Sequence, residues 1–230
     1  MNIISHVNPI GDSVRLERMA EALKSLQRRE FVGHLQGIVS NAAMLEAVAS
    51  RSSIHANGFT KLVLERHSGI ALRLHIWESG EPDTELLPAE NVHDHVWPFA
   101  SRVLIGGLYE ERFDFSRTGP LMDHYEYVRG RATLPPGNLV LNGQARLDMA
   151  ADLSHSAGNV YEVDNTVLHR AHNIGDAGWA ATLVMTGKPR VTPASVYAPV
   201  GVNVREDLRE AQLSTESVSG LLEMVIEALK

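Results

Sequence analysis

One short segment, Asn91-Val92-His93-Asp94-His95-Val96, places two histidines at alternate positions. Side chains of an extended strand alternate between the two faces of a sheet, so His93 and His95 are expected to point the same way. Two imidazoles on one face can begin a metal site, and His169 is the candidate for a third ligand. An H-x-H pair is a weak motif in a chain with 11 histidines. The surrounding sequence therefore has to support the assignment.

The segments around these histidines have the pattern of short strands. Residues 70–77, IALRLHIW, alternate, which places three aliphatic side chains on one face and Arg73, His75 and Trp77 on the other. From residue 59 to about 200, roughly ten such segments are separated by Gly, Pro, Asn and Asp turns. This pattern predicts an all-β core, a sandwich or jelly roll, rather than repeated βαβ units.

Helical patterns flank the predicted β core. Apolar residues recur every three or four positions over 13–29 and 31–48, and again over 218–229 after Ser214. A chain of 230 residues is long enough for one substantial core. We expect a single domain, with a helical part at 1–57, the core at 58–200 and a helical tail at 201–230.

Composition excludes several classes of function. The formal charge of −7, the pI near 5.9 and the lack of a basic run argue against a nucleic-acid or anionic-membrane partner. The absence of cysteine excludes disulfides, thiolate zinc sites and cysteine nucleophiles. The first residues lack a signal-peptide pattern, and no apolar run reaches the length of a membrane span. A cytoplasmic location is therefore expected.

Three imidazoles would form a site with open coordination positions. Neutral imidazole suits Fe, Zn, Cu and Ni. Three protein ligands leave room for substrate, water or dioxygen, as a catalytic metal requires. On pattern alone, the alternative is that His93, His95 and His169 are unrelated, with the first two exposed on an edge strand.

Two segments resemble the motifs of the cupin superfamily. Residues 93–113, HDHVWPFASRVLIGGLYEERF, are similar to the first cupin motif, which has H-x-H on a strand and a later Gly at a strand turn, here Gly106 or Gly107. Gly158, followed by His169-x-x-x-Asn173, is similar to the second motif, whose histidine is the last metal ligand. The resemblance implies a cupin jelly roll, or double-stranded β-helix.

A narrower resemblance is to the thiol dioxygenases, the cysteine dioxygenase-like cupins. It is carried by VHDH, GLYEERF, VLHRAHN and residues 62–80, and extends to the N-terminal helices. In that group three histidines and no carboxylate hold a non-haem Fe(II). The sequence after His95, VWPFASR, has no carboxylate, which fits the three-histidine variant. The Ser-His-Tyr relay of that group would fall at 182–186, where TLVMT lacks both His and Tyr, so a different oxygenase or lyase chemistry is an alternative.

Several side chains are candidates for substrate binding. If the polar face of residues 70–77 lines the barrel interior, Arg73 could bind a carboxylate bidentately, with His75 beside it. A solvated sheet face is an equally good interpretation. Arg102 could point inward in the same way, and Trp97 is expected to wall the pocket. The resemblance places the carboxylate-binding arginine of the thiol dioxygenases near Lys61, the nearest substitute.

These observations predict a metal-dependent cupin enzyme, best described as a non-haem Fe(II) oxygenase. Its partners would be dioxygen and a small polar, carboxylate-bearing metabolite such as an amino acid derivative. Zn, Ni, Mn and Cu stay open as metals. The alternatives are a redox-neutral metal-dependent isomerase, lyase or hydrolase, and a non-catalytic ligand-binding cupin. Cupins often dimerise through sheets, so a homodimer is one of the oligomeric states expected.

Overall fold

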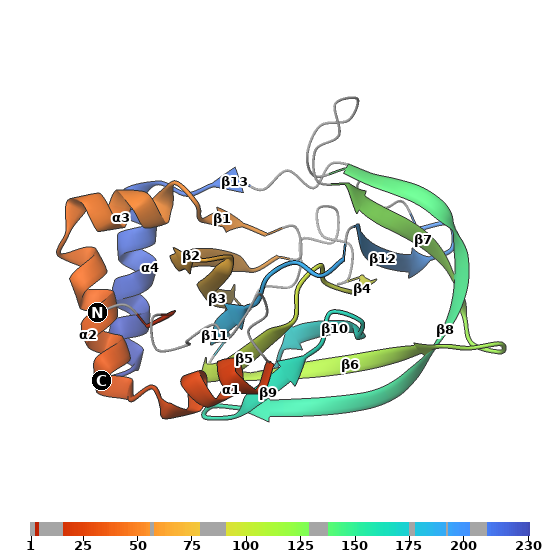
Figure 1. Cartoon of the computed structure of the whole chain (residues 1–230), viewed down its shortest axis with the longest axis horizontal. Helices are drawn as coiled ribbons and strands as arrows, with labels where there is room; N and C mark the ends of the chain where they lie inside the picture. The colour runs from red at the N-terminus through yellow and green to blue at the C-terminus, as the bar shows by residue number, and fades with distance from the viewer. Residues whose placement is uncertain are drawn as a thin grey trace.

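The computed structural model describes residues 3–4, 16–55, 58–78, 91–128, 138–174, 178–191, 193–202 and 211–230. Helices lie at one end of the molecule and two β-sheets fill the rest (Figure 1). The helices are α1 (Leu16–Ser25), α2 (Arg28–Val39), α3 (Ala42–Ala49) and α4 (Thr215–Ala228), and α4 packs against α2 and α3. Among the described residues, no helix has the length and apolar character needed to cross a membrane.

The helix boundaries differ from the predicted ones at two capping sites. Gln27 forms a capping box with Glu30, so α1 and α2 are separate helices with a break inside the predicted 13–29 segment. Asn41 caps α3 by accepting a hydrogen bond from the Met44 N–H at 3.1 Å, which divides the predicted 31–48 helix in two. The predicted C-terminal helix begins after Ser214, whose Oγ accepts a hydrogen bond from the Ser217 N–H.

The first sheet separates the helices from the interior of the β core. Its strand order is β13-β1-β2-β3-β11-β5-β9. The bounds are β1 (Ser53–Ile54), β2 (Thr60–His67), β3 (Ile70–Glu78), β5 (Phe99–Ile105), β9 (Val160–Val163), β11 (Trp179–Thr186) and β13 (Ala211–Gln212).

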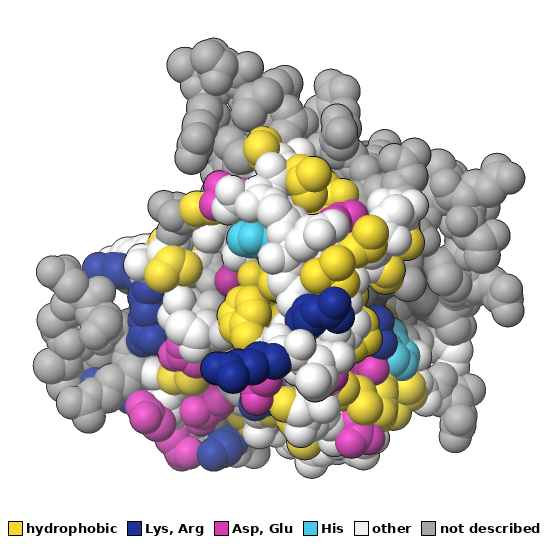
Figure 2. Space-filling model, turned by 90° about the vertical axis from the view of Figure 1, so that its right-hand side faces the viewer, with side chains coloured by type: hydrophobic (Ala, Val, Ile, Leu, Met, Phe, Trp, Pro, Cys, Tyr) yellow, Lys and Arg dark blue, Asp and Glu magenta, His cyan; other side chains and the backbone are white. Residues whose placement is uncertain are grey.

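The second sheet closes on itself as a barrel in the order β10-β4-β12-β7-β8-β6. It contains β4 (Val92–His93), β6 (Gly107–Phe115), β7 (Leu121–Val128), β8 (Asn138–Ser156), β10 (Leu168–Asn173) and β12 (Ala194–Pro199). Figure 2 looks onto the end of the molecule that this barrel forms, where hydrophobic side chains lie among charged ones.

The structure contains a single chain, so the homodimer expected from the sequence stays a prediction.

The strand order confirms the predicted jelly roll. β3, β5, β9 and β11 lie in the first sheet, whereas β4, β6, β8 and β10 lie in the second. The first of these strands pairs with the last, β3 with β11, and the second with the last but one, β4 with β10. Such nested antiparallel pairs, divided between two sheets, are the topology of a jelly roll. The all-β core with flanking helices is therefore as predicted.

Register determines which side chains face the interior. Leu72, Leu74 and Ile76 on β3 are fully buried in the core beneath the helices. Arg73 lies on the opposite face, where it is directly paired with Val184 of β11. The polar face of residues 70–77 therefore lines the space between the two sheets and is not a solvated surface.

Candidate metal centre

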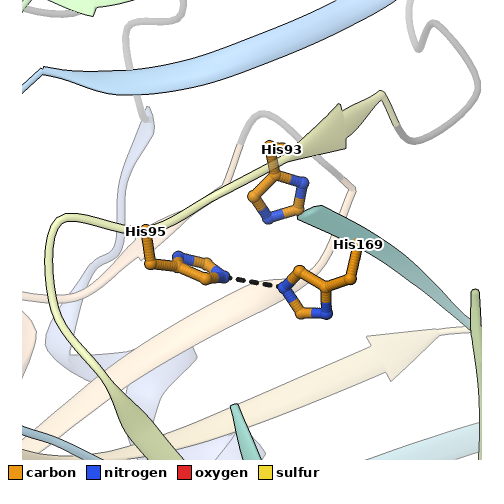
Figure 3. A group of neighbouring side chains, drawn as sticks. All are labelled: His93, His95 and His169. Atoms are coloured by element: carbon orange, nitrogen blue, oxygen red, sulfur yellow. Dashed lines mark hydrogen bonds between the residues drawn. The ribbon is translucent and has the colours of Figure 1, made fainter. Parts of the chain in front are cut away.

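The structure brings the three predicted metal ligands together. His93 ends β4 and lies directly opposite His169 of β10. One nitrogen of each of His93, His95 and His169 lies within 4.8 Å of the others. The His95 and His169 Nε2 atoms are 2.9 Å apart, and Figure 3 shows the three rings converging from the two segments.

The alternation predicted for His93 and His95 holds although β4 ends at His93. Asp94, between them, points the other way. Its carboxylate accepts a hydrogen bond from the Ser195 N–H at 2.7 Å, and its own N–H donates to the Ser195 carbonyl at 3.1 Å. These bonds hold the segment extended along β12, so both histidine side chains face the interior.

Hydrogen bonds at Nδ1 set the tautomers of two of the imidazoles. The His93 Nδ1 lies 2.9 Å from the Asn91 carbonyl, and the His169 Nδ1 lies 3.1 Å from Glu110 Oε1. A carbonyl and an ionised carboxylate only accept, so in both rings Nδ1 carries a proton, and in the neutral form of each ring Nε2 presents the lone pair. Two nitrogens at right angles on a metal, with bonds of about 2.1 Å, would be about 3.0 Å apart. The donor set therefore fits a metal ion.

Burial keeps the imidazoles of His93 and His95 neutral. It lowers the pKa of His93 to about 3, and the neighbouring His169 adds to the shift. It also lowers the pKa of His95 well below its usual range, with His93 and His169 contributing. At neutral pH these rings therefore offer the uncharged nitrogens that metal binding needs.

Glu110, on β6, connects the ligands to the rest of the interior and was not predicted from the sequence. It accepts hydrogen bonds from His169, His155 and Arg112. Burial raises the pKa of its carboxyl, but the hydrogen bonds from His155 and His169 outweigh burial and hold that pKa well below its usual range. His155 is largely buried and stacks on Tyr161, with ring centroids 3.9 Å apart. The sequence did contain one indication of its role, because Glu110 is an acidic residue inside the strand 107–115.

Aromatic side chains form a wall beside the ligands. The His95 ring stacks on Trp97, with centroids 4.7 Å apart and an interplanar angle of 18°, and meets the edge of Phe99 at 5.0 Å. The Arg73 Cζ lies 4.5 Å from the centroid of the Trp97 ring, a cation–π contact. Trp97 therefore lies between a cation and a metal-ligand candidate.

The other interior candidates lie further along β3. His75 is directly paired with Lys61 of β2 and with Thr182 of β11. Burial lowers the pKa of His75 well below its usual range, with smaller contributions from Arg73 and other nearby basic groups. Phe59 packs on His75 and Trp77 at 4.6 and 4.4 Å. Among the described residues, the His75 Nε2 and Trp77 Nε1 atoms are buried without a hydrogen-bond partner.

Arg102 was wrongly predicted to point inward. It is directly paired with Leu183 of β11, whose side chain lies in the core beneath the helices. Its guanidinium donates hydrogen bonds to the carbonyls of Leu23 and Leu26, at 2.9 and 2.6 Å. These carbonyls lie at the C-terminal end of α1, where backbone acceptors lack partners within the helix. Arg102 therefore anchors α1 and does not line the interior.

Comparison with known proteins gives only distant similarity. No protein-family model and no curated protein sequence matches the chain. Hydroxypropylphosphonic acid epoxidase from S. wedmorenis is 13% identical, with a TM-score of 0.36 over 60% of this chain and 56% of that one. Hydroquinone 1,2-dioxygenase from Sphingomonas sp. TTNP3 is 11% identical, with a TM-score of 0.30 over 56% of this chain and 65% of that one.

Oxalate oxidase in complex with the substrate analogue glycolate is 13% identical, with a TM-score of 0.32 over 70% of this chain and 63% of that one. The chain spans about half the length of the first solved structures it matches. These similarities are too weak to identify the reaction. The assignment of the fold therefore depends on the strand order of this chain, and the assignment of the site depends on its side chains.

Proposed function

We propose that this chain is a cupin-type, metal-dependent oxygenase with non-haem iron(II) held by His93, His95 and His169. The observation that carries the proposal is the convergence of three imidazole nitrogens on one point inside the jelly roll. The donors are three imidazole nitrogens with no carboxylate among them, and imidazole suits iron(II). Three ligands leave positions for a substrate and dioxygen. Iron bound there would supply charge stabilisation and redox chemistry.

The side chains around the centre would bind and orient a small anion. Arg73 faces the interior and is separated from His95 by the Trp97 ring, which contacts both residues. Its planar guanidinium suits bidentate binding of a carboxylate. Lys61 and His75 are paired on the same sheet. Trp97 and Phe99 would keep bulk water from the reacting groups. These features favour a polar, carboxylate-bearing metabolite such as an amino acid derivative as substrate.

The test combines metal analysis of freshly purified protein with oxygen uptake on a panel of amino acids, their derivatives and thiols. We expect iron to co-purify and dioxygen consumption to depend on one class of substrate. His169→Ala should remove most of the metal and the activity. The matched control is His172→Ala, because His172 is exposed on the same strand and contacts Tyr109 rather than the other histidines. Equal metal content in the two variants would refute the proposal.

A redox-neutral metal-dependent isomerase, lyase or hydrolase is the second candidate. One feature favours it: a site with three imidazole ligands and an open position also suits a catalytic zinc ion. The two candidates differ in their need for dioxygen. Turnover of the same substrate under anaerobic conditions by protein loaded with zinc, manganese or nickel would establish this second function and exclude the first.

A further inference from the structure

We propose that Glu110 is the positioning residue of this centre. Its carboxylate holds the His169 imidazole in the Nδ1–H tautomer and in the orientation that directs Nε2 toward the other two histidines. The inference depends on the proposed metal centre for its functional meaning, and its evidence is the hydrogen bonds that Glu110 accepts from the surrounding side chains.

Glu110 is the one fully buried carboxylate among the described residues, with 1% of its surface exposed. Oε1 accepts from His169 Nδ1 and Arg112 Nε, both at 3.1 Å. Oε2 accepts from His155 Nε2 at 2.8 Å and from an Arg112 terminal nitrogen at 3.3 Å. Donors on β6, β8 and β10 therefore fix the carboxylate from three sides, and both of its oxygens are used.

The position of Glu110 makes it a support and not a fourth ligand. It contacts Nδ1 of His169, whereas the Nε2 atom of that ring faces His95. Arg112, whose charge offsets that of Glu110, also donates to the Glu162 carbonyl of β9 at 3.2 Å. Because both of its oxygens accept these hydrogen bonds, the carboxylate would have to break them to reach a metal held by the three histidines. Carboxylates that bind the second nitrogen of a metal-bound histidine fix its tautomer and raise its basicity.

A merely structural ion pair between Glu110 and Arg112 is the competing explanation. It predicts that removal of the carboxylate lowers stability and leaves the His169 tautomer unchanged. Positioning predicts a changed tautomer as well. The matched control is Glu111, the next residue of β6, which faces the other way and forms an ion pair with Arg170.

The first measurement is the tautomer of His169 in the full chain after removal of metal by a chelator. Long-range proton–nitrogen NMR correlations distinguish Nδ1–H from Nε2–H imidazoles. We expect Nδ1–H in the unsubstituted chain and in Glu111→Ala, and a mixture or the Nε2–H form in Glu110→Ala. A proton on Nε2 in the unsubstituted chain would overturn the proposal without any variant, so the test survives if Glu110→Ala does not fold.

The second measurement is the dissociation constant for cobalt(II), followed through its visible absorption. We expect binding about 10- to 100-fold weaker in Glu110→Ala, a smaller loss in Glu110→Gln, and little change in Glu111→Ala. Equal affinity in the Glu110 and Glu111 variants would refute the positioning role. Failure of the unsubstituted chain to bind cobalt or iron would instead refute the metal centre, so the two failures are distinguishable.

Discussion

At the scale of single residues, burial decides the charge of the candidate ligands. Histidine has an ordinary pKa of 6.5, but burial and the neighbouring imidazoles depress those of His93 and His95 in the folded chain. Two properties follow from one cause. The rings are ready to bind a cation at neutral pH, and the folded state resists their protonation in acid.

The free energy of unfolding of the metal-free chain should therefore depend on the His93 imidazole. Between pH 6.5 and its folded pKa of about 3, the unfolded chain binds a proton at this ring and the folded chain does not. Its contribution to stability is fully present above pH 6.5 and is lost as pH falls through this window. Urea unfolding at pH 7 and pH 5 should show a smaller loss in His93→Gln than in the unsubstituted chain. His67→Gln, at an exposed histidine, is the control. An equal loss in all three proteins would contradict this expectation.

Arg73 should act on substrate binding more than on the chemical step. Its guanidinium lies against Trp97 rather than among the three histidines. For the carboxylate-bearing substrate identified by oxygen uptake, we expect Arg73→Gln to raise KM about tenfold or more, corresponding to a lost charge-assisted hydrogen bond. Metal content should not change. Arg190→Gln is the control, since Arg190 forms a half-exposed ion pair with Asp164. An unchanged KM would remove Arg73 from the substrate site.

At the scale of elements, the attachment of α1 to the sheet depends on Arg102. Replacement by alanine removes two hydrogen bonds to helix carbonyls. We expect Arg102→Ala to lower the free energy of unfolding by about 2 kcal/mol. Because the side chain lies on the helix side of β5, KM and metal content should stay unchanged. A raised KM with unchanged stability would restore the sequence-based assignment of Arg102 to the substrate site.

Strand alternation predicted which side chains share a face of a strand, but it did not always predict what that face packs against. It placed Arg73 on the face of β3 opposite Leu72, Leu74 and Ile76. Because the helices cover the aliphatic face, the face that carries Arg73 lines the interior. For Arg102 the alternation was sound, but the assigned face was wrong. Residues 99–105 carry apolar side chains on both faces, Ala100 and Leu104 on the side of Arg102 and Phe99 and Val103 on the other, so the pattern does not show which face the helices cover. Glu110 was missed because its partners come from β8 and β10, and the sequence does not show that these strands meet there.

At the scale of the whole molecule, we expect the jelly roll to form without the three histidines. The main hydrophobic core lies between the first sheet and the helices, and His169 lies on the second sheet. A site on a stable scaffold can lose a ligand without losing the fold. We therefore expect His169→Ala to retain the circular dichroism spectrum and a cooperative unfolding transition. Global unfolding of this variant would show that the centre is part of the core.

Metal binding should nevertheless stabilise the whole fold, because an ion that binds only the folded state adds its binding free energy to the unfolding equilibrium. At a free metal concentration of about 100 times Kd, the gain is about 2.7 kcal/mol. For a chain of this length that corresponds to a rise in Tm of several degrees. The rise should reverse with a chelator, persist in His172→Ala and vanish in His169→Ala. Exposed carboxylates could bind metal weakly, but such binding would raise Tm equally in both variants. An equal rise would therefore place the stabilising ion outside the three histidines.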